Sequence, residues 1–222
     1  MDTYRAAAGN VVLAALLAGV PATARAQSGP VMQGDVAAAI GWLSVNWAAE
    51  SATGGRDWAT SLIGTASAGW YWTDRSKTEI DFGASATARG YATQPVVIGG
   101  RTSYSFIESS VTRRVVGIGQ HHQFYRNAWF HPCVAAGANV AWQRVTDRIG
   151  PTFAYDEASR TSRVVEPERT EGPRTELVVR PYVATGFKAY MSQRAFFRSD
   201  LRASFGRRLE DVVVRFGFGV DF

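Results

Sequence analysis

The clearest pattern in the chain is Val212-Val213-Val214-Arg215-Phe216-Gly217-Phe218-Gly219-Val220-Asp221-Phe222. Successive residues of a β-strand point to opposite faces, so these residues divide into two sets. One face is wholly apolar and consists of Val212, Val214, Phe216, Phe218, Val220 and Phe222. The other face carries Val213, Arg215, Gly217, Gly219 and Asp221. An apolar outer face and a tight, polar inner face predict a strand of a membrane β-barrel, with lipid outside.

Seven earlier segments alternate in a similar way. They span residues 35–47, 58–73, 78–91, 103–124, 129–143, 177–191 and 196–206. Together with 212–222 they predict an all-β fold, an eight-stranded antiparallel up-and-down transmembrane β-barrel. The phase of the fourth segment slips at residues 120–122, where we expect a β-bulge.

Short and long connections alternate along the chain. Residues 74–77, 126–127 and 192–193 are short, whereas 48–57, 92–102 and 146–175 are longer. Bacterial barrels have short periplasmic turns and longer external loops, so both chain ends are expected on the periplasmic side. The aromatic residues fit two girdles. The periplasmic girdle would contain Trp70, Trp72, Phe124, Phe130, Phe197 and Phe222, and the outer girdle Trp58, Trp142 and Phe205.

Alternation by itself leaves another fold open. A secreted β-sandwich or a lipocalin-type barrel also alternates, with its apolar face inside. The predicted girdles, the terminal Phe222 and the leader described below favour the membrane barrel.

The chain resembles the small outer-membrane β-barrel proteins of Gram-negative bacteria, of the OmpA/OmpW type. The resemblance rests on the last strand ending at Phe222 and on three internal segments. These are Gly69-Trp70-Tyr71-Trp72-Thr73-Asp74, Phe130-His131-Pro132-Cys133-Val134-Ala135-Ala136-Gly137 and Arg180-Pro181-Tyr182-Val183-Ala184-Thr185-Gly186. It implies a location in the cell outer membrane, and Phe222 as an assembly signal for the barrel assembly machinery. It implies no single activity, because members of this group differ widely.

Residues 1–26 have the features of a signal peptide. Arg5 supplies positive charge, residues 11–20 form a short apolar run, and Ala24-Arg25-Ala26 is a small-x-small cleavage site. The run is shorter than the roughly 20 apolar residues that span a bilayer. We therefore predict a signal peptide at 1–26 and an outer-membrane β-barrel domain at 27–222.

The composition narrows the set of partners. The formal net charge is +5, but the 24 basic residues are interspersed with 19 acidic ones, so we expect no nucleic-acid binding. Cys133 is the only cysteine, which excludes an internal disulfide. We expect a monomer whose partners are outer-membrane lipid and lipopolysaccharide.

The predicted inward faces carry charges of both signs from several strands. They are Glu79, Asp81, Arg89, Arg180, Lys188, Arg198, Asp200, Arg202, Arg215 and Asp221. An eight-stranded barrel has room inside for side chains but little more. Unpaired buried charges are costly, so these residues are expected to form a plug of salt bridges. A network that opens into a narrow channel is the alternative.

No constellation of residues predicts catalysis. The candidates are His121, His122 and His131, but no carboxylate accompanies them at a recognisable spacing. The outer-leaflet deacylases of this architecture carry a His-x-Ser motif, which this sequence lacks. We predict no catalytic residue, no metal site and no cofactor. The predicted function is a structural or surface-interaction role, with a narrow porin-like channel for small solutes as the alternative.

Two features concern the predicted outer surface. Residues 146–175 are strongly polar and are expected to form a solvated, mobile loop, with a binding surface as the alternative. Arginines occur in or beside the external connections, and a guanidinium binds phosphate through two hydrogen bonds. We therefore predict contact with lipopolysaccharide at Arg207 and Arg208.

Overall fold

The computed structural model describes residues 33–47, 57–98, 101–124, 129–156 and 160–222. The predicted signal peptide at 1–26 lies outside these ranges. No helix in the described part of the chain is long and apolar enough to cross a bilayer. The described strands are β1 (Gly34–Trp47), β2 (Asp57–Tyr71), β3 (Ser76–Ser85), β4 (Ala88–Ile98), β5 (Arg101–Gln123), β6 (Phe130–Ile149), β7 (Thr152–Asp156), β8 (Thr161–Glu166), β9 (Arg169–Tyr190), β10 (Ala195–Phe205) and β11 (Leu209–Asp221).

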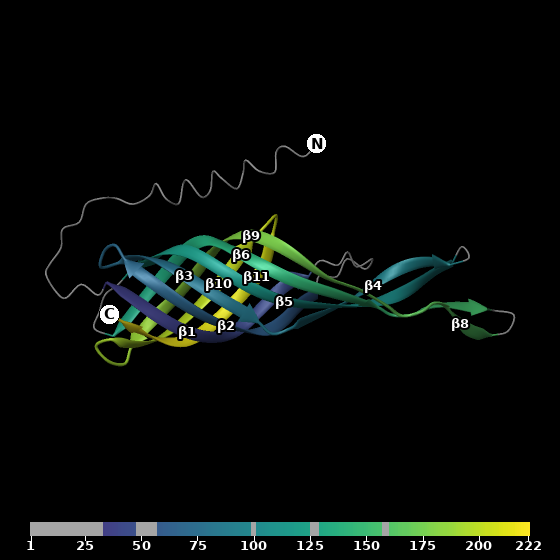
Figure 1. Cartoon of the computed structure of the whole chain (residues 1–222), viewed down its shortest axis with the longest axis horizontal. Helices are drawn as coiled ribbons and strands as arrows, with labels where there is room; N and C mark the ends of the chain where they lie inside the picture. Colours follow the sequence, from purple (N-terminus) through teal and green to yellow (C-terminus); the bar gives the residue numbers. More distant parts are fainter. Residues whose placement is uncertain (1–32, 48–56, 99–100, 125–128, 157–159) are drawn as a thin grey trace, which may run out of the picture. The chain divides into compact units, whose positions relative to one another are not determined.

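Eight of these strands form a closed antiparallel ring (Figure 1). Their order around the ring is β3, β2, β1, β11, β10, β9, β6 and β5, and β5 pairs with β3 to close it. The first strand pairs with the last, with Asp35 opposite Asp221 and Val45 opposite Asp211. The predicted eight-stranded antiparallel barrel is therefore confirmed.

The two faces of the ring differ sharply in polarity. On β11, Phe218 is 61% exposed whereas Arg215 is 3% exposed. On β9, Val183 is exposed and Lys188 is buried. Apolar residues outside and charged residues inside reverse the arrangement of a soluble protein, in which charged residues are almost never fully buried unless paired. The lipocalin-type alternative, with its apolar face inside, does not describe this ring.

Arg89 corrects the predicted interior set. β3 ends at Ser85 and β4 begins at Ala88, so the two intervening residues interrupt the alternation. The pattern restarts in the opposite phase, which buries Ala88 and leaves the Arg89 side chain 64% exposed. Its guanidinium lies 3.8 Å from the carboxylate of Glu108. The prediction that Arg89 belongs to the interior network is wrong.

The predicted connections at 92–102 and 146–175 are largely strands in their described residues, whereas 48–56 lie outside the described ranges. β4 and β5 remain paired as far as Ile98 and Arg101, and β4 has no place in the ring (Figure 1). β6 and β9 remain paired as far as Ile149 and Arg169, and β7 and β8 form a separate hairpin. The expected loop at 146–175 is thus wrong for its described residues, because main-chain pairing continues through it.

Ion pairs between residues distant in sequence accompany this extension. Asp147 lies 2.5 Å from Arg174, and Arg148 pairs with Glu168. The hydrogen bond from Arg148 holds the pKa of the Glu168 carboxyl below its ordinary value. The alternating charges that suggested a solvated loop are, in part, partners across strands.

Strand registers also correct the expected bulge at 120–122. β5 pairs with both β3 and β6 through these residues without a shift. Shifts occur instead between Val145 and Asp147 on β6 and between Ser204 and Phe205 on β10. Inward-facing Arg113, His121 and Gln123 are all buried, so β5 keeps one phase.

Candidate functional site

Three groups of charged side chains fill the interior of the ring. The first lies near the connection between β2 and β3. Asp35 on β1 is fully buried and accepts hydrogen bonds from the Lys77 Nζ at 2.6 and 2.9 Å. Asp35 also binds Lys188 on β9, whose Nζ lies 3.3 Å from Asp221. Two lysines and two aspartates therefore offset one another at this end of the barrel.

The second group joins opposite walls of the barrel. Arg198 on β10 donates to Glu79 on β3 from Nη1 at 3.2 Å and from Nη2 at 3.0 Å. Arg202 on β10 donates to Asp81 on β3 at 3.0 and 2.9 Å. β3 and β10 are four steps apart in either direction around the ring, so they face each other across the lumen. Two bidentate ion pairs therefore span the lumen, and bidentate geometry gives the strong form of this contact.

Arg215 and Asp200 link these two pairs into one network. The Arg215 Nε donates to Asp200 at 2.8 Å, and its Nη1 lies 3.4 Å from Asp81. Asp200 also lies 3.3 Å from Arg198. Each carboxylate in this group contacts more than one cationic side chain. The loss of one carboxylate therefore leaves more than one cationic side chain without that partner.

The third group lies farther along the barrel. Asp211 on β11 accepts hydrogen bonds from Arg113 on β5 at 2.8 Å and from Arg180 on β9 at 3.0 Å. The amide oxygen of Gln143 accepts a further bond from the Arg113 Nε at 3.1 Å. β11 and β5 are again four steps apart in the ring, so this group also spans the lumen.

Apolar side chains and small cavities lie between these groups. Leu43, Val45, Ile63 and Val213 form an apolar cluster inside the ring, with Val115 packed against it. Two cavities lined largely by interior residues have volumes of about 20 Å³ each. A cavity needs about 10–15 Å³ of such volume to hold one water. Each cavity therefore accommodates roughly one water molecule.

The structure brings nine of the ten predicted interior charges together. Arg89 is the exception; the nine buried residues are Glu79, Asp81, Arg180, Lys188, Arg198, Asp200, Arg202, Arg215 and Asp221. The sequence reasoning missed four others, Asp35, Lys77, Arg113 and Asp211. Lys77 and Asp211 were assigned to connections, but β3 begins at Ser76 and β11 at Leu209. Arg113 was missed because no inward face was assigned along 103–124, where a slip was expected at 120–122.

The predicted candidates for chemistry have different neighbours. The His121 Nε2 is buried 3.8 Å from a Glu79 oxygen, and His131 packs its ring 4.8 Å from that of Tyr190. His122 faces outward and contacts Ser76 at 3.2 Å. Cys133 is a free thiol. The described ranges contain no cluster of three His, Cys, Asp or Glu residues that could hold a metal ion.

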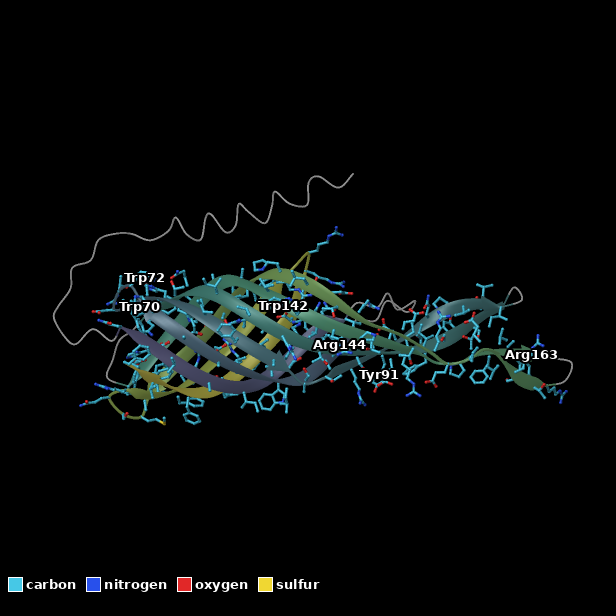
Figure 2. All side chains as sticks on the ribbon, in the orientation of Figure 1. Trp70, Trp72, Tyr91, Trp142, Arg144 and Arg163 are labelled. Atoms are coloured by element: carbon cyan, nitrogen blue, oxygen red, sulfur yellow. The ribbon has the colours of Figure 1, made fainter. Side chains whose placement is uncertain are left out.

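Aromatic residues mark the two ends of the outer wall. Trp70 and Trp72 lie at the end near the β2–β3 connection, and Trp142 lies towards the other (Figure 2). Phe222 is exposed at the first end, and its backbone exchanges hydrogen bonds with Gly34. Its role as an assembly signal stays a prediction. Arg207 and Arg208 lie in the connection between β10 and β11, with Arg207 exposed and Arg208 half-buried.

No family model matches the chain, and no curated protein matches it in a sequence comparison. Solved structures of similar architecture include the N-terminal β-barrel domain of Pseudomonas aeruginosa OprF, with 14% identity, 86% of this chain and 98% of that chain covered, and a TM-score of 0.48. The outer membrane protein OprG from Pseudomonas aeruginosa has 12% identity, with 86% of this chain and 96% of that chain covered, and a TM-score of 0.48. Yersinia pestis Ail, in complex with the heparin analogue sucrose octasulfate, has 12% identity, with 86% of this chain and 99% of that chain covered, and a TM-score of 0.43.

Proposed function

We propose that this protein is a monomeric, integral outer-membrane β-barrel with a closed lumen and a structural or surface-interaction role, without enzymatic activity. The two bidentate ion pairs that join β3 and β10 across the lumen carry this proposal. A solute passing through would have to separate buried opposite charges, which is strongly unfavourable. The paired charges in the lumen therefore favour a structural role over the transport of solutes.

The outer wall supports the membrane location. Ile40, Phe82, Val179 and Phe218 are large apolar residues that point outward and are exposed. The ring leaves no unpaired strand edge around its circumference, which is the condition for β-structure in a hydrocarbon environment. A wall of this kind is stable in lipid and aggregates in water.

The strands beyond the ring support a role at the cell surface. Tyr91 on β4 stacks on Phe106 on β5 with ring centroids 5.5 Å apart, and both remain exposed. Phe153 and Tyr155 on β7 are exposed as well. Tyrosine is among the residues that carry most of the binding energy at protein interfaces, so this surface suits a protein partner. At the rim, Arg207 and Arg208 would contact the phosphates of lipopolysaccharide.

Trypsin digestion of intact cells tests both the location and the orientation. Trypsin cleaves after arginine, and the exposed Arg160 and Arg163 lie between β7 and β9, at the end assigned to the cell surface. Figure 2 shows Arg163 far from Trp70 and Trp72. We expect cleavage at 160–163 in intact cells, with two fragments that separate only after denaturation.

The chain contains its own control for this experiment. Arg75 and Arg194 are exposed in the connections at the opposite end of the ring. They should be cut only after the outer membrane is permeabilised. Recovery of the protein in the soluble periplasmic fraction would contradict the membrane location, and cleavage at Arg75 before Arg163 would contradict the orientation.

A further inference from the structure

Two arginines point outward from the largely apolar wall of the ring. Arg114 on β5 and Arg144 on β6 are both exposed. In the register of β5 and β6, Arg114 lies opposite Trp142 and Arg144 lies opposite Thr112. The two arginines are therefore close to each other on the same strand pair. Neither guanidinium makes an ion pair or a hydrogen bond with any residue in the described ranges. Both are therefore available to an anionic partner from outside the chain.

The height of these arginines on the wall follows from the strand geometry. Phe124 belongs to the aromatic residues at the opposite end of the wall, and Arg114 is ten residues before it on the same chain segment. At about 3.3 Å per residue and a tilt of about 40°, this spacing corresponds to about 25 Å of height, the thickness of the apolar band of outer-membrane barrels. Charged residues on the lipid face are much better tolerated near the interface than at the midplane. Arg114 therefore lies at the outer boundary of the apolar band.

A groove of about 1110 Å³ lies on this wall, and both arginines belong to its lining. Its lining includes Gly64 and Ala66 on β2, Phe82 and Ala84 on β3, and Trp142 on β6. The recess exists because small residues stand beside large ones. A Cβ placed on Gly64 would meet no atom within 4 Å. In Figure 2, Trp142 and Arg144 lie close together on this wall.

A largely apolar groove whose lining includes two unpaired guanidiniums fits one class of ligand, a lipid with acyl chains and a phosphate headgroup. Arginine binds phosphate through paired, charge-assisted hydrogen bonds. We propose that this groove binds the phosphorylated, multiply acylated lipid A part of lipopolysaccharide, with Arg114 and Arg144 on its phosphates and its acyl chains along Gly64, Ala84 and Trp142. The choice of lipid A over a phospholipid rests on the proposed function, whose outward orientation sets this groove in the outer leaflet.

Equilibrium binding of fluorescent lipid A and of fluorescent phosphatidylglycerol to the full barrel in detergent micelles tests this site. The double variant Arg114→Ala/Arg144→Ala should bind lipid A about tenfold more weakly, because two charge-assisted contacts are lost. Gly64→Leu keeps both arginines and fills the groove, and it should weaken binding as well. The control Arg75→Ala/Arg194→Ala removes the same charge from the other end of the barrel and should change the affinity by less than about twofold, because neither residue lies near the groove.

Several outcomes would overturn the proposal. One is equal binding of lipid A and phosphatidylglycerol to the wild type. Another is unchanged lipid A binding by Gly64→Leu, with folding checked by the gel mobility of the unheated protein. A loss confined to Arg207→Ala/Arg208→Ala would move the contact to the β10–β11 rim. The trypsin pattern of intact cells separates a failure of this site from a failure of the proposed orientation.

Discussion

Replacing Asp81 by alanine lowers the free energy of unfolding by about 3–5 kcal/mol, the cost of leaving buried charge without its partner. Asp81 receives both donors of Arg202 and lies 3.4 Å from Arg215, and all three side chains are at most 5% exposed. Urea unfolding of the barrel in lipid vesicles, followed by tryptophan fluorescence, measures this loss.

Arg89→Ala is the matched control for Asp81→Ala. It also removes one partner of an ion pair, but its side chain is 64% exposed and 3.8 Å from Glu108. Exposed pairs contribute about 0–1 kcal/mol. Equal losses for the two variants would show that the interior pairs contribute no more than surface pairs, and would contradict a barrel held together by its buried charges.

Replacing Gly137 by valine prevents folding of the barrel or strongly destabilises it. Gly119, Gly137 and Tyr182 lie side by side on the inner wall, in one row across β5, β6 and β9. A Cβ on Gly137 would lie 2.8 Å from the Tyr182 Cζ and closer still to the backbone oxygen of Ile118. Tyr182 is 2% exposed, and the Arg202 guanidinium lies 4.0 Å from its ring centroid, so the ring has little room to retreat.

Overpacking a filled core costs about 1–3 kcal/mol and sometimes more. Here the added atoms also press on the backbone of β5, so we expect the upper end of that range or beyond. The yield of folded protein after dilution from urea into micelles measures the effect. Gly64→Ala is the control, because its Cβ enters open space on the outer wall. Refolding of Gly137→Val as efficiently as Gly64→Ala would contradict the close packing of this row.

Strict alternation made most of the fold predictable from the sequence. Arg215 and Asp221 on β11 and Lys188 on β9 each stand between outward apolar residues, so both the strands and the direction of their faces followed. Alternation predicted the wrong face where one strand ended and the next began in the opposite phase. Residues 86–87 reset the phase, and Arg89 was therefore placed on the wrong face. The pattern of β1 did not predict that Asp35 is an inward charge, because other inward residues of that strand, such as Ala37, Leu43 and Val45, are apolar.

The external segments were the least predictable part. Charges at 146–175 alternate as they would in a solvated loop, yet Arg174 and Asp147 meet because β6 and β9 stay paired. Such pairing depends on residues 27 positions apart in sequence, which local patterns do not report. The groove at Arg114 and Arg144 could not be predicted from the sequence either, because it combines small residues of β2 and β3 with arginines of β5 and β6.

Single-channel recording in planar lipid bilayers tests the closed lumen most directly. With purified, folded protein we expect no steady conductance steps, because ion pairs join β3 to β10 and β11 to β5 across the lumen. Arg198→Ala/Glu79→Ala removes one of these pairs and serves to detect leakage that the ion pairs normally prevent. Steady openings of the wild type whose amplitude changes in Arg198→Ala or Arg215→Ala would contradict the closed lumen and establish the narrow channel instead.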